Sequence, residues 1–253
     1  MPAGTSGELQ PLRVVVVDDE PPARDLLAQY LEQIPGIEMV ASCRDGFEAV
    51  KAIAELEPDV VLLDIQMPKL SGFEVLELLE ERPQIVFATA HDEFAIEAFN
   101  VAAVDYLLKP IDPKRLTKAL ERARARLASR EEQPIERLIE ERRRTGDTLP
   151  RVLVRRGAEV HVLQLSDIDY VEAQDDYIVF HSGGTSLRKK QTLSDAERQL
   201  GSAFARIHRS FLLNLDRLQR IEPYAKDSRV AFLDDGTRLP VSRSGYERLR
   251  RLL

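Results

Sequence analysis

The stretch from Val60 to Pro68 constrains the fold more than any other part of the chain. Four consecutive apolar residues, Val60 to Leu63, run directly into Asp64, and Pro68 follows as a turn signal. A short, fully apolar run of this kind is typical of a strand buried on both faces, as in a parallel sheet. In open α/β sheets, ligands and chemistry gather beside the carboxyl ends of the strands. We therefore expect Asp64 to lie at such an end.

The first half of the chain alternates between short apolar runs and amphipathic stretches. The apolar runs have the length of buried strands, and they cover residues 13–17, 37–41, 60–64, 85–88 and 103–108. The amphipathic stretches have apolar residues at helical spacing, and they cover residues 22–34, 46–56, 72–81, 92–101 and 113–127. Five successive β-α units predict an α/β domain with a doubly wound five-stranded parallel sheet.

Charge divides the chain into two unlike parts. Residues 12–128 carry 13 Lys and Arg against 22 Asp and Glu, a balance of −9. Residues 148–253 carry 18 against 14, a balance of +4. This asymmetry in a chain of 253 residues indicates two domains with different partners, and the basic one is suited to a polyanion.

Composition excludes some classes of protein. The single cysteine, Cys43, excludes an internal disulfide framework and fits a reducing cytoplasm. No apolar run approaches the roughly 20 residues that a membrane crossing needs, and Met1 to Gln10 lacks the pattern of a signal peptide. We expect a cytoplasmic protein with no membrane partner.

Polar side chains follow four of the predicted strands. Asp18 and Asp19 follow the first strand, Asp64 the third, Thr89 the fourth and Lys109 the fifth. Clustered carboxylates suit Mg²⁺, and an Asp can form an aspartyl-phosphate whose charge a cation and a lysine would neutralise. A lone Asp after a strand is usually a helix cap or a turn residue, but four strand ends in this order are a more specific signal.

Residues 12–127 resemble the receiver domain of two-component response regulators. The motifs that carry the resemblance are Val17-Asp18-Asp19-Glu20, Leu63-Asp64-Ile65-Gln66-Met67-Pro68, Gly72, Thr89-Ala90 and Asp105-Tyr106-Leu107-Leu108-Lys109-Pro110. The resemblance implies a flavodoxin-like fold in which Asp64 accepts a phosphoryl group from a sensor histidine kinase. The implied ligands of Mg²⁺ are Asp19, Asp64 and the backbone carbonyl of Gln66, with Asp18 acting through water. The implied switch and phosphoryl-binding residues are Thr89, Tyr106 and Lys109.

Between residues 129 and 147 the chain changes to charged residues around a short apolar stripe. Pro134 can open a helix, and Arg142 to Arg144 lie in its last turn, where positive charge suits the helix dipole. We interpret the segment as a linker helix with a solvated basic end rather than as a DNA contact. The expected domains are then residues 12–128 and 148–253.

The second half of the chain reads as a mostly β domain. Two strands around a turn are expected over residues 152–163, and further strands over 168–172, 177–181, 211–213, 218–223, 229–233 and 239–241. Helices are expected over residues 192–200 and 245–253, and Gly183-Gly184 is a hairpin signal. The histidines are far apart in the sequence and no catalytic motif is present, so we expect no enzyme. Basic residues are expected in loops, including Arg155-Arg156, Arg188 to Lys190, Arg206, Arg209 and Arg243.

This half resembles the LytTR DNA-binding domain. The long motif from Phe204 to Asp216 carries the resemblance, with Leu239 to Ser244 and Tyr170 to Ala173. The family implies small β-sheets that present loops to successive major grooves. The implied contacts to bases are Arg209, Arg243 and, in the loop of residues 174–177, Asp176, and the implied contacts to phosphates are Lys189 and Lys190.

Two features of this resemblance leave alternatives open. Many relatives have Asn where Asp176 stands, and two adjacent carboxylates would repel phosphates, although an Asp can accept a hydrogen bond from cytosine N4. Asn214 and His208 are as well explained as buried polar groups that hold a loop as they are as base readers.

The sequence therefore predicts a response-regulator transcription factor of the LytR/AlgR type. Phosphorylation of Asp64 would promote a homodimer, and two tethered domains would bind repeated sites in double-stranded DNA with higher overall affinity. One alternative is a phosphatase of the haloacid dehalogenase type, although those enzymes carry the nucleophile on the first strand. Another is an output domain that binds RNA or protein.

Overall fold

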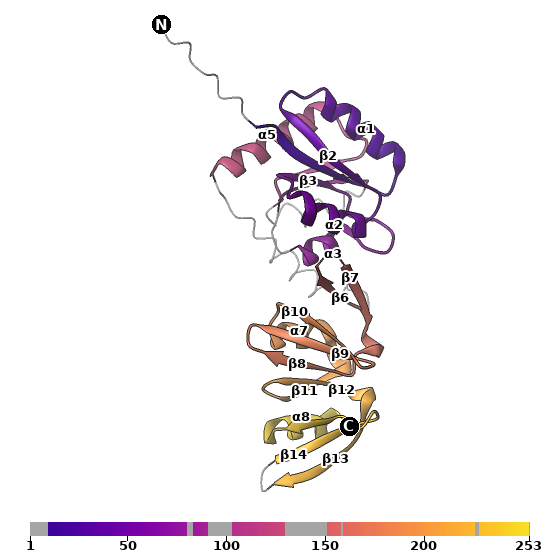
Figure 1. Ribbon diagram of the computed structural model, residues 1–253, viewed down its shortest axis with the longest axis vertical. Helices are drawn as coiled ribbons and strands as arrows, with labels where there is room; N and C mark the ends of the chain where they lie inside the picture. The colour runs from indigo at the N-terminus through magenta and orange to yellow at the C-terminus, as the bar shows by residue number, and fades with distance from the viewer. Residues whose placement is uncertain are drawn as a thin grey trace. The chain divides into compact units, whose positions relative to one another are not determined.

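The computed structural model describes residues 10–79, 83–90, 103–129, 151–157, 159–225 and 228–252 (Figure 1). The chain divides into two compact units, Met1–Thr145 and Gly146–Leu253. The helix predicted over residues 92–101 and the linker helix beyond Ser129 lie outside the described residues. Among the described helices, none has the length and apolar character needed to cross a membrane.

The N-terminal unit contains the predicted five-stranded parallel sheet. Its strands are β1 (Leu12–Val17), β2 (Ile37–Cys43), β3 (Val60–Leu63), β4 (Gln84–Thr89) and β5 (Asp105–Leu108). They lie in the order β2-β1-β3-β4-β5, and every neighbouring pair is parallel. This order confirms the flavodoxin-like fold class. It also brings the carboxyl ends of β1, β3, β4 and β5 to one edge of the sheet.

Helices cover both faces of this sheet. They are α1 (Pro21–Glu32), α2 (Gly46–Leu56), α3 (Gly72–Leu78) and α5 (Pro113–Ser129). Buried residues of α1 and α5 share one core cluster with alternate residues of β1, β3 and β4. On the other face, Phe73 of α3 lies with its ring 5.2 Å from that of Phe87 in β4. Because both faces are covered, the inner strands β1, β3 and β4 are buried along nearly their whole length and are mostly apolar, and this is why they could be recognised in the sequence.

One predicted helix is too long. The helix expected over residues 72–81 ends at Leu78, because Leu79 takes an extended conformation in which its side chain is buried. Helical spacing cannot distinguish a buried residue in the last turn of a helix from one just beyond it. Cys43 is buried, and burial raises the pKa of its thiol to about 11.

The C-terminal unit is mostly β, as predicted. A hairpin of β6 (Arg151–Arg156) and β7 (Glu159–Gln164) comes first. A five-stranded antiparallel sheet follows in the order β10-β9-β8-β12-β11. Its strands are β8 (Tyr170–Gln174), β9 (Tyr177–Ser182), β10 (Thr185–Lys189), β11 (Phe204–His208) and β12 (Phe211–Asn214). A three-stranded sheet contains β13 (Leu218–Ala225), β14 (Ser228–Leu233) and β15 (Arg238–Val241).

Two helices pack on opposite faces of the five-stranded sheet. Buried residues of α7 (Leu193–Leu200) share a core cluster with β6, β8, β9 and β12. A second cluster joins α8 (Arg243–Leu252) and the three-stranded sheet to the other side of β11 and β12. The alternation within β11 decides this division, since Phe204 lies in the first cluster and Ala205 and Ile207 lie in the second.

The structure corrects several sequence-based assignments in this unit. The hairpin signal at Gly183-Gly184 is confirmed by the antiparallel pair of β9 and β10, but the sequence pattern gave no range for β10 and no strand at β11. β10 is an edge strand in which only Leu187 is buried, so it carries almost no apolar alternation. Arg243, expected in a loop, is the first residue of α8. Other basic residues expected in loops lie in strands, namely Arg155, Arg156, Arg188, Lys189 and Arg206.

Candidate functional site

Three carboxylates meet at the edge of the parallel sheet. Asp18 and Asp19 follow β1 and Asp64 follows the neighbouring β3, and each offers an oxygen within 4.8 Å of the others. The backbone joins these segments directly, because the Asp64 amide donates to the Val17 carbonyl oxygen at 2.9 Å. Asp18 is 1% exposed and Asp64 5% exposed. The sheet order therefore brings together the acidic residues that the sequence placed at separate strand ends.

Lys109 follows β5, an edge strand of the sheet, and its side chain reaches this cluster. Its Nζ lies 2.7 Å from Asp18 Oδ2 and 2.7 Å from Asp64 Oδ2. Burial lowers the pKa of Lys109, but the two carboxylates outweigh burial and hold this pKa above its usual value. The side chain is therefore a fixed positive charge between two buried acids.

Thr89 ends β4 next to this lysine. The Lys109 amide donates to the Thr89 carbonyl oxygen at 2.8 Å, so the two residues are joined through the backbone. The Thr89 side chain is fully buried, and within the described parts of the chain its hydroxyl has no hydrogen-bond partner. A buried hydroxyl without a partner costs roughly 1–3 kcal/mol. Tyr106 of β5 is opposite Phe87 of β4, and its side chain is buried.

The loop after Asp64 is fixed by close backbone contacts. The Gln66 amide donates to Asp64 Oδ1 at 3.2 Å. At the end of the loop, the Gly72 amide donates to the Ile65 carbonyl oxygen at 2.9 Å. A Cβ at Gly72 would lie 2.3 Å from the Asp64 carbonyl oxygen, so only glycine fits there. Ser71 and Glu74 then form a capping box that starts α3.

The composition of the cluster fits a hard cation. Asp18, Asp19 and Asp64 bring three carboxylates, and Lys109 brings one positive charge to them. Buried negative charge without a partner is costly, and carboxylate oxygens are the ligands that divalent cations such as Mg²⁺ prefer. The structure therefore contains an acidic cluster that could hold a metal ion.

In the C-terminal unit, two turns meet at one end of the five-stranded sheet. Gln174 and Tyr177 close the β8–β9 turn, in which Asp175 has a φ of 52° and Asp176 is exposed. The β11–β12 turn lies beside it, because the Ala173 amide donates to the Ser210 carbonyl oxygen at 2.8 Å. Arg209 is exposed in this second turn.

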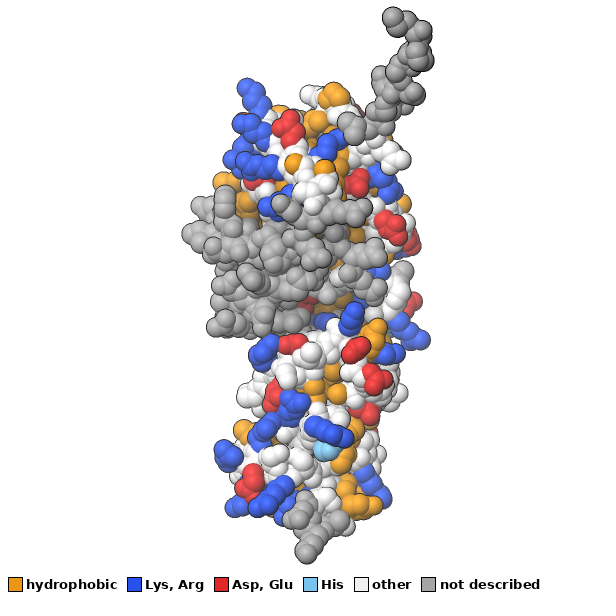
Figure 2. Space-filling model, turned by 90° about the vertical axis from the view of Figure 1, so that its left-hand side faces the viewer, with side chains coloured by type: hydrophobic (Ala, Val, Ile, Leu, Met, Phe, Trp, Pro, Cys, Tyr) orange, Lys and Arg blue, Asp and Glu red, His pale blue; other side chains and the backbone are white. Residues whose placement is uncertain are grey.

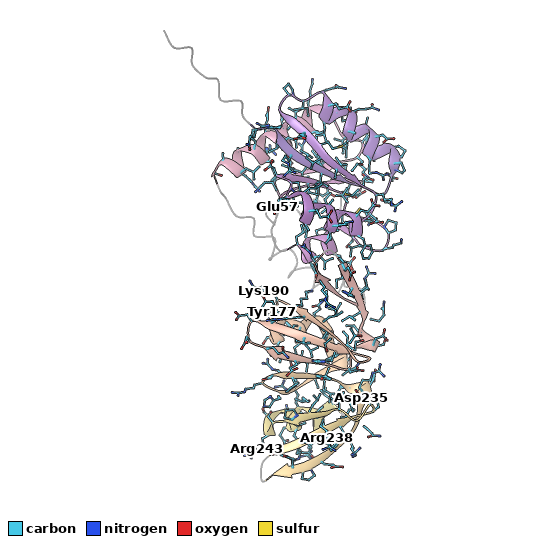
Figure 3. All side chains as sticks on the ribbon, in the orientation of Figure 1. Glu57, Tyr177, Lys190, Asp235, Arg238 and Arg243 are labelled. Carbon is cyan, nitrogen blue, oxygen red and sulfur yellow. The ribbon has the colours of Figure 1, made fainter. Side chains whose placement is uncertain are left out.

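Lysines and Arg243 reach the same end. Lys189 ends β10 opposite Ile178, at the start of β9, and Lys190 follows it. Lys and Arg side chains gather on the face of the C-terminal unit that Figure 2 shows. This face is the left-hand side of the unit in Figure 3, where Lys190 and Arg243 lie, and Asp235 lies on the right.

Arg243 reaches this end because α8 is attached to β11. The Ser242 amide donates to the Ile207 carbonyl oxygen at 2.9 Å, two residues before Arg209. A Cβ at Gly245 would lie 1.9 Å from that same oxygen, so α8 can approach β11 this closely only with glycine. All five residues predicted to contact DNA therefore lie near one end of the sheet.

Asn214 and His208 have different surroundings. Asn214 is buried, donates from Nδ2 to the Ile168 carbonyl oxygen at 2.7 Å and accepts at Oδ1 from the Asp216 amide. These hydrogen bonds hold the backbone around Asn214, so this residue is explained as a buried polar group that holds a loop rather than as a base reader. His208 is half-buried and accepts at Nδ1 from the Ser210 amide at 3.3 Å, within the β11–β12 turn.

The sequence did not single out Glu197 and Arg248, which lie beside this end. Arg248 of α8 is 3.2 Å from the Glu197 carboxylate of α7. Each residue lies on the solvated side of an amphipathic helix, where a charge is the ordinary occupant. Nothing in the sequence pattern separates them from other surface charges.

Comparison with known families agrees with both resemblances. The family "Response regulator receiver domain" matches residues 14–121, and the family "LytTr DNA-binding domain" matches residues 158–253. The first match contains every residue of the acidic cluster, and the second contains both turns and α8.

Several relatives are similar to this chain over nearly their whole length. The transcriptional regulatory protein BtsR of Escherichia coli is 37% identical over 243 residues, which are 94% of this chain and 98% of that protein. The positive alginate biosynthesis regulatory protein of Pseudomonas aeruginosa is 35% identical over 254 residues, 96% of this chain and 99% of that protein. The sensory transduction protein LytT of Bacillus anthracis is 32% identical over 246 residues, with similar coverage of 96% and 99%.

These relatives decide the class of protein. Together with the two family matches they give a transcriptional response regulator, so the expectation that this chain is not an enzyme is confirmed by its family. The alternative of a phosphatase is excluded on the same ground. The chain belongs to the LytTR family of two-component response regulators, transcriptional regulators in which a receiver domain precedes a LytTR DNA-binding domain.

Proposed function

We propose that a sensor histidine kinase phosphorylates this chain on Asp64 in the cytoplasm, and that phosphorylation promotes a homodimer that binds repeated sites in double-stranded DNA. The observation that carries the proposal is the position of Lys109, 2.7 Å from the carboxylates of both Asp64 and Asp18. A lysine between two buried acids is the arrangement that an acyl phosphate on one of them needs. The proposed domains are residues 12–128 and 148–253, with a linker helix over 129–147.

The proposed transfer forms one bond and breaks one. A carboxylate oxygen of Asp64 attacks the phosphorus of a phosphohistidine in the kinase, and the P–N bond breaks as the P–O bond forms. The electron pair of the broken bond stays on the imidazole, which takes up a proton. Lys109 stabilises the negative charge on the phosphoryl oxygens. Bound Mg²⁺ would supply further neutralisation, held by Asp18, Asp19, Asp64 and the Gln66 carbonyl.

The switch would run through Thr89 and Tyr106. The Thr89 hydroxyl is buried and has no partner in the described parts of the chain, so a phosphoryl oxygen would give it an acceptor. Because Lys109 and Thr89 are joined through the backbone, a shift at either residue moves the other. Tyr106 would occupy the space behind Thr89, and this local charge event would change the surface that dimerises.

The DNA contacts would come from the end of the five-stranded sheet. Arg209 and Arg243 can reach guanine bidentately, and Asp176 can accept from cytosine N4. Lys189 and Lys190 would neutralise phosphates, which makes affinity fall with salt. In a dimer the second domain binds at a high effective concentration, so two modest contacts give one tight complex.

The test is the Asp64→Asn variant of the full chain. We expect it to lose labelling by a small phosphodonor and to lose phosphodonor-dependent tightening on a duplex selected from a random pool by the wild-type chain. Asp19→Asn is the matched comparison, since it removes a proposed metal ligand but leaves the acceptor, so labelling should persist at a reduced rate. Labelling of Asp64→Asn at the wild-type level would disprove the assignment of the acceptor.

A further inference from the structure

A basic groove lies between the β11–β12 turn and the start of α8. It has a volume of about 370 Å³ and is lined by Arg206, His208, Arg209, Ser242, Ser244 and Arg248. Three of these six residues are arginines, and none is acidic. Such a lining is suited to an anion that can accept several hydrogen bonds.

One carboxylate beside the groove orients two of its arginines. Glu197 of α7 lies 3.2 Å from Arg248 and 3.6 Å from Arg206. Arg206 is also held by the Ser194 hydroxyl, and it donates to the Arg209 carbonyl oxygen at 3.1 Å. Arg206 therefore ties the β11–β12 turn to α7. Because Glu197 neutralises only one of the three arginine charges, the groove keeps a net positive charge.

The remaining arginines are free to extend. Arg209 and Arg243 are exposed, and within the described ranges neither has an ion-pair partner. The groove lies between Arg209 on the turn and Ser242 and Ser244, which flank Arg243. Burial, and then the charge of Arg209, lower the pKa of His208 in this groove.

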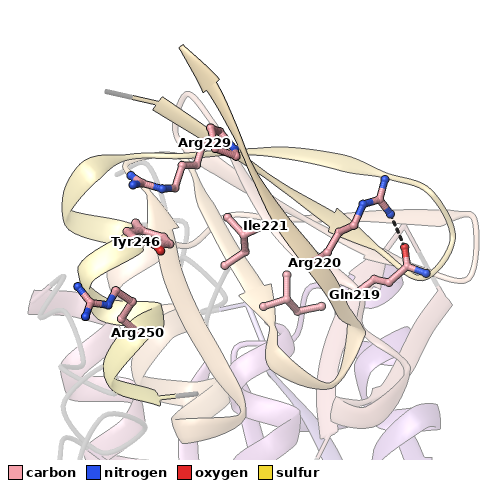
Figure 4. Close-up of a pocket in the computed structure, with 8 residues that line it drawn as sticks. Gln219, Arg220, Ile221, Arg229, Tyr246 and Arg250 are labelled. Carbon is pink, nitrogen blue, oxygen red and sulfur yellow. Dashed lines mark hydrogen bonds between the residues drawn. The ribbon is translucent and has the colours of Figure 1, made fainter. Parts of the chain in front are cut away.

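A second hollow on the same helix has a different character. It has a volume of about 590 Å³, and its lining includes the apolar side chains of Leu218, Ile221 and Pro223. Arg229 is stacked 3.7 Å from the centre of the Tyr246 ring, and Arg250 lies on the other side of that ring (Figure 4). Arg250 thus has the same charge as Arg248 and lies on the same helix, but it lines a different hollow.

We propose that the basic groove seats one phosphate of the DNA backbone, held by Arg248 and Ser244 between Arg209 and Arg243. This inference rests on the proposed binding of double-stranded DNA. Arg206 and Glu197 act as positioning residues, because they fix the turn that carries Arg209. A phosphate held there sets the distance of the two extended arginines from the bases, since backbone contacts fix the register of a protein on the duplex.

The test compares Arg248→Ala with Arg250→Ala in the full chain. Each is titrated with salt on a duplex selected by the wild-type chain and on a scrambled duplex of the same length. We expect Arg248→Ala to weaken binding to both duplexes by the same factor and to lower the slope of log affinity against log salt by about 1. Arg250→Ala should keep the wild-type slope. Arg248→Lys keeps the charge, so it should keep most of the slope.

The positioning role has a different signature. Glu197→Gln removes the negative charge but keeps the size, so binding to the scrambled duplex should tighten. The preference for the selected duplex should fall at the same time, because the turn that carries Arg209 is less firmly held. A change that were merely structural would weaken binding to both duplexes.

Several outcomes would overturn the proposal. These are an unchanged slope for Arg248→Ala, an equal drop for Arg250→Ala, or a loss of preference at a single base pair for Arg248→Ala, which is the behaviour expected of Arg243→Ala. If Arg248→Ala does not fold, Ser244→Ala decides: it should weaken binding to both duplexes equally, and an unchanged affinity in this variant refutes the site. If the wild-type chain shows no salt-dependent binding to either duplex, the proposed function itself fails.

Discussion

The acidic cluster and the end of the C-terminal unit that we propose to contact DNA are built in opposite ways. The acidic cluster lies where parallel strands end side by side, and its principal side chains are buried, with Asp64 5% exposed and Lys109 14% exposed. The proposed DNA-contacting end is made of antiparallel turns and a helix start, and Arg209 and Arg243 are exposed there. The difference shows that sheet order alone positions the first site, whereas the second depends on contacts between elements that the sheet order does not specify.

The two sites also differ in what a substitution costs. Removing one partner of a buried ion pair typically costs several kcal/mol, because the other charge is left buried. Removing an exposed charge costs the fold little, so it acts on binding alone. Variants should therefore couple stability to function in the receiver domain and separate them in the LytTR domain.

The largest loss of stability is expected at the two glycines whose Cα atoms pack closely against a backbone carbonyl oxygen, one in each site. Gly72→Ala and Gly245→Ala would each force a Cβ onto backbone, at 2.3 Å and 1.9 Å. We expect each to lower the free energy of unfolding of its own unit by roughly 3–5 kcal/mol. Gly72→Ala should slow phosphodonor labelling, and Gly245→Ala should abolish DNA binding. Denaturant unfolding with a separate probe in each domain measures the two losses of stability.

Gly184→Ala provides the control for this pair. Gly184 has a φ of +81° and nothing near its Cβ position, so only backbone strain of about 1 kcal/mol is expected. If all three variants were equally destabilised, close approach of the backbone would not be the reason for glycine at the two sites.

A somewhat smaller effect is expected from Lys109→Met. This change leaves Asp18 and Asp64 without their shared cation, and we expect a loss of roughly 3 kcal/mol at pH 7 that Mg²⁺ partly reverses. Because the pKa of Lys109 is raised in the folded state, its contribution to the free energy of unfolding is complete below pH 10.5, the ordinary pKa of lysine. This contribution is lost only as the pH rises through the raised pKa. Urea unfolding from pH 7 upward measures this loss.

Lys51 of α2 offers a matched control. It lies 4.0 Å from Glu55 and its side chain is 61% exposed, so Lys51→Met should have little effect on unfolding. An equal loss in the two variants would contradict the view that burial distinguishes the acidic cluster.

The smallest effect is a pH dependence in the C-terminal unit. Burial lowers the pKa of His181, whose ring is stacked 4.1 Å from that of Tyr170. The folded state therefore favours the neutral ring. The stability that His181 contributes above pH 6.5, the ordinary pKa of histidine, is lost as the pH falls through the lowered pKa. Thermal unfolding between about pH 7.5 and 5.5 should show a decrease that His181→Gln removes. A decrease that persists in His181→Gln would assign it to another group.

The sequence predicted the receiver domain closely because one physical rule covers most of it. Strands buried on both faces are apolar throughout, and successive β-α units place their ends at one edge. Asp18, Asp64, Thr89 and Lys109 could therefore be grouped from their positions after the apolar runs alone. The end of α3 at Leu78 could not be foreseen, since a buried residue looks the same inside a helix and just after it.

Less of the LytTR domain could be predicted from pattern. Strand β10 has one buried side chain, and the order β10-β9-β8-β12-β11 depends on long-range pairing that no local period records. Arg209 and Arg243 could be named only through resemblance to the family. The groove between them could not be predicted. It depends on the contact between Glu197 of α7 and Arg248 of α8, and these helices are 43 residues apart in the sequence (from Leu200 to Arg243).

The paired glycines have a consequence for how freely this protein can be altered. At Gly72 and Gly245 the missing side chain is replaced by a carbonyl oxygen of the chain itself, so no neighbouring side chain can be trimmed to make room. Compensating second-site changes, which rescue many core substitutions by repacking, are therefore ruled out at these two positions. In a library of random variants selected for function, we expect these two glycines to remain fixed while positions in the side-chain core exchange.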